Sequence, residues 1–110
     1  MITFTGNPRI FLCKSPMDMR NGFEGLSAAV QLFFSEEVTS GNFFVFLNKP
    51  RDRMKILYWD TDGLAIWNKR LEKGRFLKLE SEKALITRRE FFMVLEGITP
   101  KRIQKRYSVF

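Results

Sequence analysis

The 110-residue chain contains no histidine and a single cysteine, Cys13. Without histidine it lacks the commonest general base, the Ser-His and Cys-His nucleophile pairs and most zinc sites. One thiolate cannot build a metal cage, and a lone cysteine in the apolar run 9–13 is typical of packing rather than of a nucleophile. The glycines form no phosphate-cradling loop of the G-x-x-x-x-G-K type. The sequence therefore indicates no cofactor, and we expect a protein that is not an enzyme.

Long apolar runs are also missing. No stretch approaches the roughly 18 apolar residues that a membrane span needs. The start MITFTGNPR lacks the charged start, apolar middle and cleavage site of a secretory leader. Cys13 has no partner for an internal disulfide, which suits a reducing compartment. We therefore expect a cytoplasmic protein without membrane contact.

Hydrophobic residues, at 45%, and aromatic residues, at 15%, are ample for one packed domain. The net charge of +7 is unevenly distributed: −1 over residues 1–48, +5 over 49–78, −1 over 79–98 and +4 over 99–110. Concentrated positive charge favours a polyanion, nucleic acid first and acidic membrane second, while a purely solubilising surface is the alternative. We expect one domain over residues 1–98 and a basic helix or tail over residues 99–110.

The first half of the chain predicts a strand and then a helix. Arg9–Cys13 is a short apolar strand, and Ser15-Pro16 provides an N-cap and a first-turn proline. The apolar face of the helix recurs at steps of four and three residues: Met19, Phe23, Leu26, Val30 and Phe33. Gly22 and Gly25 indicate a close approach of the helix backbone to a sheet, with a backbone-to-phosphate contact as the alternative.

The middle of the chain predicts an antiparallel meander. Residues 43–47 form an unbroken apolar run typical of a central strand, and residues 53–59, 64–71 and 75–79 follow as further strands. The turn over residues 60–63 suits a type I turn with a glycine bulge. Thr87 and Glu90 form a capping box that opens another helix, Gly97 ends it, and Thr99-Pro100 starts a third. We predict an α+β fold, an antiparallel three- to four-stranded meander packed by two or three helices.

The aspartates of the turn raise the question of a metal site. Asp60 and Asp62 resemble the start of a calcium loop, but the fifth and twelfth positions, which need oxygen ligands, are Leu64 and Leu71. A two-metal nuclease would need further carboxylates from scattered elements to converge. We therefore interpret the aspartates as turn residues and assign no metal ligand.

The hairpin around this turn interleaves basic and aromatic side chains, a combination that suits nucleic acid. Antiparallel pairing would place Arg53 near Arg70 and Lys55 near Asn68, and like charges facing each other hint at function because they cost stability. We expect the two tryptophans of the hairpin, at positions 59 and 67, to lie in the core. The candidate DNA-binding residues are Arg20, Lys49, Arg51, Arg53, Lys55, Lys69, Arg70, Lys73, Arg75, Lys101, Arg102, Lys105 and Arg106.

Three blocks of the sequence occur in the order and with the spacing that are typical of one protein family. They are PMDMRNGFEGL (16–26), SGNFFVFLN (40–48) and RDRMKILYWDTDGLAIWNKRLEKGRF (51–76). In these blocks the chain resembles the accessory protein, often called TnpB, that the second open reading frame of bacterial insertion sequences of the sixty-six family encodes. The resemblance covers about residues 9 to 98. The motif positions it carries over are Asp18, Arg20, Gly22, Gly25, Asp52, Arg53, Lys55, Trp59, Asp60, Gly63, Lys69, Arg70, Glu72 and Gly74.

The resemblance implies a helper in DNA transposition, acting beside a separate transposase, and it carries over no catalytic residue. We therefore expect a non-catalytic accessory protein that binds DNA phosphates through its basic hairpin, with DNA and the transposase of the same element as partners. One alternative is a protein-interaction module that docks onto the transposase without touching DNA. Another is a metal-dependent nuclease that uses Asp60 and Asp62.

Overall fold

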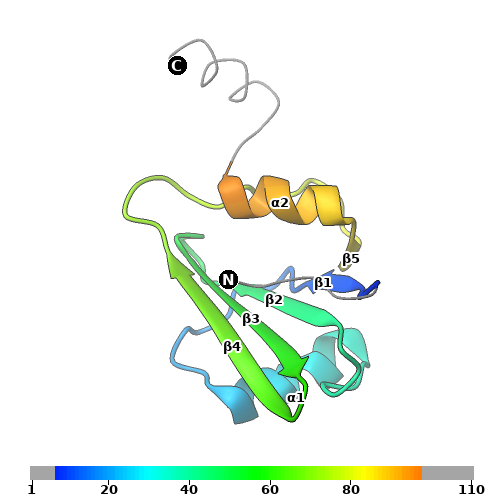
Figure 1. Ribbon diagram of the computed structural model, residues 1–110. Coiled ribbons are helices and arrows are strands. Elements are labelled where there is room, and N and C mark those ends of the chain that lie inside the picture. The colour runs from blue at the N-terminus through cyan, green and yellow to red at the C-terminus, as the bar shows by residue number, and fades with distance from the viewer. Residues whose placement is uncertain (1–6, 98–110) are drawn as a thin grey trace.

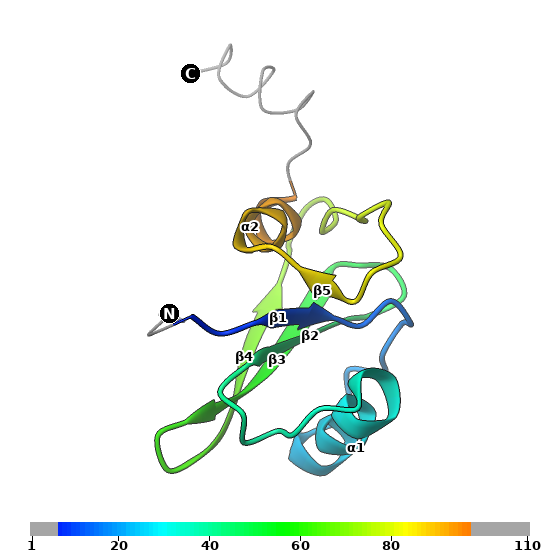
Figure 2. The same cartoon turned by 90° about the vertical axis from the view of Figure 1, so that its right-hand side faces the viewer.

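The computed structural model describes residues 7–97, which form a five-stranded sheet with one helix on each face (Figures 1 and 2). The strand order is β4-β3-β2-β1-β5. This architecture confirms the predicted α+β class. The elements are β1 (Ile10–Leu12), α1 (Phe23–Phe34), β2 (Phe43–Leu47), β3 (Arg53–Asp60), β4 (Gly63–Arg70), β5 (Leu85–Ile86) and α2 (Arg88–Glu96).

The sheet is mixed rather than purely antiparallel. Strands β2, β3 and β4 form the predicted antiparallel meander, but β1 pairs parallel with β2, and β5 pairs antiparallel with β1. The parallel pair exists because α1 carries the chain from the end of β1 back to the start of β2, as a crossover connection must. The prediction of an antiparallel meander is thus correct for three strands, whereas the parallel pairing of β1 with β2 was not predicted.

Strand β2 lies at the centre of the sheet, and all five of its residues are buried. Successive side chains alternate between two cores, as a strand with both faces covered requires. Phe44 and Phe46 pack toward α1, whereas Phe43, Val45 and Leu47 pack toward α2. The prediction of a central strand at residues 43–47 is confirmed.

Helix α1 begins later than the sequence predicts. The Met17 N–H donates to Leu47 O at 2.8 Å, so the chain after β1 continues alongside β2 instead of turning into a helix at Ser15-Pro16. A turn follows, in which the Asn21 N–H donates to Asp18 O at 3.1 Å, and the helix starts only after Gly22. The predicted helix start is wrong because the backbone donors there are used by a neighbouring strand.

The buried face of α1 also differs from the prediction. Leu26 and Val30 are buried as expected, but Phe23 and Phe33 are 48% and 44% exposed. Phe34 packs against the α1-side core instead, stacking on Phe44 with ring centroids 5.7 Å apart. The predicted stripe is correct in the middle of the helix and wrong at its ends.

The glycines do not serve a close approach of helix to sheet. A Cβ at Gly25 would collide with the side chain of Asn21, and a Cβ at Gly22 would meet nothing within 4 Å. Gly25 therefore leaves room for the side chain of Asn21, and the prediction that these two glycines bring the helix backbone close to the sheet is wrong.

The segment after β4 is irregular, so the predicted strand over residues 75–79 is wrong. The Phe76 N–H donates to Arg51 O at 2.7 Å and the Leu77 N–H to Val94 O at 3.4 Å. These backbone partners are a loop and a helix end rather than a strand. The buried side chain of Phe76 instead fills the core on the α2 side. The fifth strand is β5, a two-residue element that the sequence did not indicate.

Helix α2 confirms its predicted signals. The Glu90 N–H donates to Thr87 Oγ1 at 3.0 Å, and the Thr87 N–H donates to Glu90 Oε1 at 2.9 Å, which is the reciprocal capping box. Gly97 ends the helix with a φ of 66°. Phe91 and Val94 bury its apolar face. The predicted helix at Thr99-Pro100 and the boundary at residue 98 lie outside the described residues.

The turn between β3 and β4 is shorter than predicted. Asp60 pairs with Gly63, which leaves only Thr61 and Asp62 in the loop, without the expected bulge. Thr61 has a φ of 55°, a conformation that a β-branched residue rarely adopts and that two-residue turns usually give to glycine. The turn therefore stores backbone strain at Thr61.

We predict that Thr61→Gly stabilises the protein. Glycine removes a steric cost of about 1–2 kcal/mol in the left-handed region and adds an entropic cost of about 0.5–1 kcal/mol. The free energy of unfolding, measured by urea titration, should rise by about 0.5–1 kcal/mol. Asp62→Gly is the control: Asp62 has no positive φ, so this variant should be no more stable than the parent. A Thr61→Gly variant that is less stable than the parent would contradict the inference that the backbone is strained at Thr61.

Candidate nucleic-acid interface

One end of the sheet collects most of the cations of the described chain. Five segments come together there: the carboxyl ends of β1 and β2, the start of β3, the end of β4 and the segment around residue 78. The two-residue turn of the β3–β4 hairpin lies at the opposite end of these strands. We call this region the basic end. Its cations are Lys14, Lys49, Arg51, Arg53, Lys55, Lys69, Arg70 and Lys78.

The loop from β2 to β3 is held by the side chain of Asn48. Its Oδ1 accepts hydrogen bonds from the N–H groups of Asp52 and Arg53, both at 3.0 Å, and its Nδ2 donates to Asp52 Oδ1 at 2.7 Å. Arg51 adopts a φ of 59° within this loop. The bonds fix a tight turn from which Lys49 and Arg51 extend.

The β3–β4 register confirms the predicted pairing: Arg53 lies opposite Arg70, and Lys55 lies opposite Asn68. Alternation places these four side chains on the α1 face of the sheet, because their neighbours Met54 and Ile56 belong to the α2-side core. Lys69, opposite Met54, extends from the other face. A shallow hollow of about 430 Å³ lies here, lined by Met19, Arg53, Met54, Lys55, Asn68, Lys69 and Arg70.

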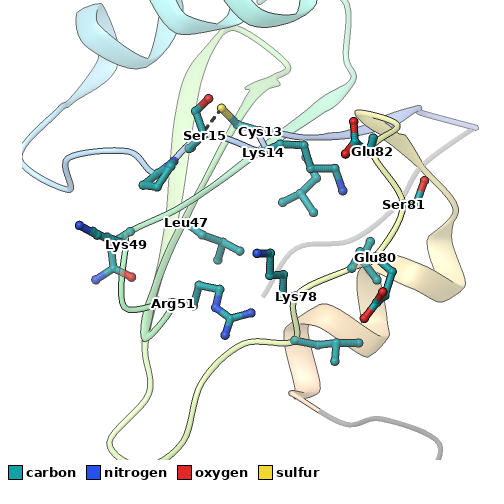
Figure 3. A pocket seen from close by; sticks show the side chains of 15 residues that line it. Cys13, Lys14, Ser15, Leu47, Lys49, Arg51, Lys78, Glu80, Ser81 and Glu82 are labelled. Atoms are coloured by element: carbon teal, nitrogen blue, oxygen red, sulfur yellow. Dashed lines mark hydrogen bonds between the residues drawn. The ribbon is translucent and has the colours of Figure 1, made fainter.

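A second hollow, of about 620 Å³, opens between the carboxyl ends of β1 and β2 and the irregular segment 77–82 (Figure 3). Figure 3 shows Arg51 and Lys78 pointing into it from opposite walls, while Lys49 points outward. Lys14 lies on the far side beside Glu82. Partial burial lowers the pKa of Lys14, and the charges of Glu90 and Glu82 oppose this shift.

Sequence reasoning missed Lys14 and Lys78. Lys14 follows β1, and the carboxyl ends of adjacent parallel strands meet at one edge of a sheet, so it lies near Lys49. A prediction that β1 lies parallel to β2 would have identified Lys14 as part of the basic end. Lys78 lies in the segment 75–79, whose path depends on contacts with Arg51 and Val94.

Arg20 is engaged by a neighbouring carboxylate. Its Nη2 donates to Asp18 Oδ2 at 2.7 Å, and its Nε lies 3.1 Å from both carboxylate oxygens. The hydrogen bonds from the Arg20 side chain and backbone lower the pKa of Asp18 from 3.8 to about 2. In the same turn Asn21 O accepts a hydrogen bond from Lys55 Nζ at 2.8 Å, which ties the turn to β3. Arg20 therefore contributes little net positive charge.

Most of the other predicted cations lack an acidic partner. Arg70 pairs with Glu72 at 3.2 Å, an exposed contact of small energetic consequence. Among residues 7–97, the following make no ion pair with another described residue: Lys49, Arg51, Arg53, Lys55, Lys69, Lys73 and Arg75. Lys73 and Arg75 are exposed beyond the end of β4. Lys101, Arg102, Lys105 and Arg106 lie outside the described residues.

The tryptophans are half-buried rather than enclosed in the core as predicted. Trp67 packs at the edge of the α2-side core, and Trp59 lies opposite Leu64 near the turn. Cys13 is buried, and its burial raises the pKa of the thiol, which suits packing and not a nucleophile.

The aspartates of the turn are both exposed. Within residues 7–97, no three side chains of the histidine, cysteine, aspartate and glutamate types come together as a metal site would require. None of the helices in this part of the chain is long and apolar enough to cross a membrane.

Comparison with known proteins identifies the family. Residues 8–105 match the family described as IS66 Orf2 like protein, so the chain belongs to this family, which is associated with an accessory role in transposition. The match runs past residue 98 into the basic tail, further than the resemblance of the three blocks reaches.

Two curated relatives come from Sinorhizobium fredii (strain NBRC 101917 / NGR234). The uncharacterized protein y4jC is 30% identical over 100 residues, which is 89% of this chain and 86% of the relative. The uncharacterized protein y4hO is 29% identical over 103 residues, which is 92% of this chain and 90% of the relative. No solved structure matches the chain.

We predict that Asn48→Ala destabilises the protein by about 2–3 kcal/mol, because it removes three hydrogen bonds, two of them partly buried, each with a net worth of about 1 kcal/mol. Urea unfolding measures the loss. Asn68→Ala is the matched control, since Asn68 is exposed and its side chain makes no hydrogen bond to another described residue. Equal losses in the two variants would mean that the Asn48 bonds do not hold the loop.

Proposed function

We propose that the protein is a non-catalytic accessory protein of DNA transposition that binds DNA phosphates through its basic end. The observation that supports this is the collection of cations on the loop after β2, the β3–β4 ladder and two further segments, most of them without an acidic partner among the described residues. Family membership independently links the chain to transposition.

The chemistry of the basic end suits a phosphate backbone better than base recognition. Lysine and arginine neutralise phosphates and release counterions, and this term carries no sequence information. Both hollows open to solvent beside these cations, which suits contact with an extended backbone. Because Trp59 and Trp67 are half-buried, stacking on unpaired bases adds little. The protein should therefore prefer double-stranded DNA of any sequence.

We predict that the double variant Lys49→Gln/Arg53→Gln weakens DNA binding roughly tenfold or more at ~0.1 M salt. The slope of log affinity against log salt concentration should become shallower by about two, because two phosphates are no longer neutralised by the protein. Fluorescence anisotropy with a labelled duplex, titrated at several salt concentrations, measures both quantities.

The matched control is Lys83→Gln/Arg89→Gln, which removes the same charge from two exposed cations outside the basic end. It should leave the slope close to that of the parent. No binding by the parent protein, or equal effects of the two double variants, would overturn phosphate binding at this end.

A second candidate function is docking onto the transposase of the same element. Helix α1 exposes three large apolar side chains, Phe23 at 48%, Leu32 at 77% and Phe33 at 44%. Exposed aromatic and aliphatic groups on one helix are the usual anchors of a protein interface.

We predict that Leu32→Glu abolishes co-purification with the transposase if α1 is the docking surface, since it places a charge in an apolar contact. Gln31→Glu is the control, because it adds the same charge at an exposed neighbouring position. Retention of the transposase by the Leu32→Glu variant would exclude docking through α1.

A further inference from the structure

The outer edge of β4 has no pairing partner within residues 7–97. Strand β4 spans eight residues at one border of the sheet, whereas β5 at the opposite border spans two (Figure 1). A long edge strand presents a row of free backbone donors and acceptors that can pair with another strand. Natural proteins usually block such an edge with proline, a bulge or a charge near its middle, and residues 63–68 carry none of these.

The hydrogen-bonding pattern tells which residues of β4 point their backbone groups outward. Asp60 and Gly63 flank a two-residue turn, so they form a hydrogen-bonded pair, and the Leu71 N–H donates to Asp52 O at 2.8 Å. Odd-numbered residues of this strand therefore bond to β3. The even-numbered residues turn their N–H and C=O groups away from the sheet: Leu64, Ile66, Asn68 and Arg70.

The charges along this edge are polarised. The two-residue turn that precedes β4 carries Asp62, which is exposed like Asp60 at the end of β3, and β4 ends with Lys69 and Arg70. Between them lie four apolar residues, 64–67, each only partly buried. An edge that is acidic at one end, apolar in the middle and basic at the other complements a copy of itself that runs antiparallel.

We propose that two copies of the chain associate by antiparallel pairing of β4 with β4, centred on Ile66. In this register Ile66 lies opposite its own symmetry mate, and Ala65 lies opposite Trp67 of the second copy, a small residue beside a large one. Asp62 lies opposite Arg70 of the second copy. The outward-facing residues 64, 66 and 68 then hydrogen bond across the interface.

Other arrangements are less favourable. A shift of the register by two residues in one direction, centred on Trp67, places Leu64 opposite Arg70. The shift in the other direction, centred on Ala65, places Asp62 opposite Asn68 and leaves Arg70 beyond the turn, because residue 60 already belongs to β3. Both shifts separate Asp62 from Arg70. A parallel arrangement brings the two basic ends together, where like charges facing each other destabilise a ladder. In the proposed register, the two-fold axis that relates the two copies is perpendicular to the sheet. The two five-stranded sheets therefore join into one continuous sheet, and both α1 helices lie on the same face of it.

Charge reversal tests the proposal, because it alters exposed side chains and spares the fold. Light scattering after size exclusion and sedimentation of the full chain, in the absence of DNA and at concentrations up to about 1 mM, report the oligomeric state. The parent should be dimeric. Arg70→Glu and Asp62→Arg should each raise the dissociation constant of the dimer by about tenfold or more, since each sets like charges across the interface.

The double variant Asp62→Arg/Arg70→Glu should recover the affinity of the parent, because the pair is restored with its signs exchanged. Lys73→Glu is the matched control: it makes the same charge change as Arg70→Glu at an exposed position outside the paired register, and it should leave the dimer unchanged. A monomeric parent, single variants that dimerise like the parent, or a double variant that stays as weak as the singles would each overturn the pairing.

Discussion

The burial of β2 on both faces is the constraint on which the rest of the structure depends. A strand whose five residues are all buried must have strands on both sides and a layer of other residues over each face. Strand β3 supplies one neighbour through a short turn, and β1 supplies the other through the α1 crossover. Because β1 runs parallel to β2, their carboxyl ends lie side by side. The positions of Lys14 and Lys49 at one end of the sheet follow from this arrangement.

The elements that could be predicted are those whose determinants are close in the sequence. The capping box of α2 needs only Thr87 and Glu90, and the register of Arg53 against Arg70 follows from a short turn. The elements that could not be predicted depend on distant partners. Helix α1 starts late because the Met17 N–H is bound by Leu47 O, and the segment around Phe76 is irregular because its donors are used by a loop and a helix end.

The same distinction holds for the basic end. Its hairpin cations were predictable because an antiparallel ladder brings them together from nearby positions. Lys14 and Lys78 were not, since only the sheet topology brings them close to Lys49. Counting charges also overestimated the positive charge that Arg20 offers to a partner. Arg20 holds the carboxylate of Asp18 through both of its oxygens, so the pair is nearly neutral. A segment's composition determines the sign of its charge, but the contacts decide which charges are available to a partner.

The energetics of the basic end argue against a surface whose purpose is solubility alone. Arg53 and Arg70 lie directly opposite each other, which costs a few tenths to about 1 kcal/mol, and dispersed charges would keep the protein soluble without that cost. The loop beside them is nevertheless held by three hydrogen bonds from Asn48, which fix the backbone from which Lys49 and Arg51 extend. A solubilising surface gains nothing from a fixed loop, whereas binding to a row of phosphates with regular spacing does. The combination of tolerated repulsion and a rigid support therefore favours an anionic partner.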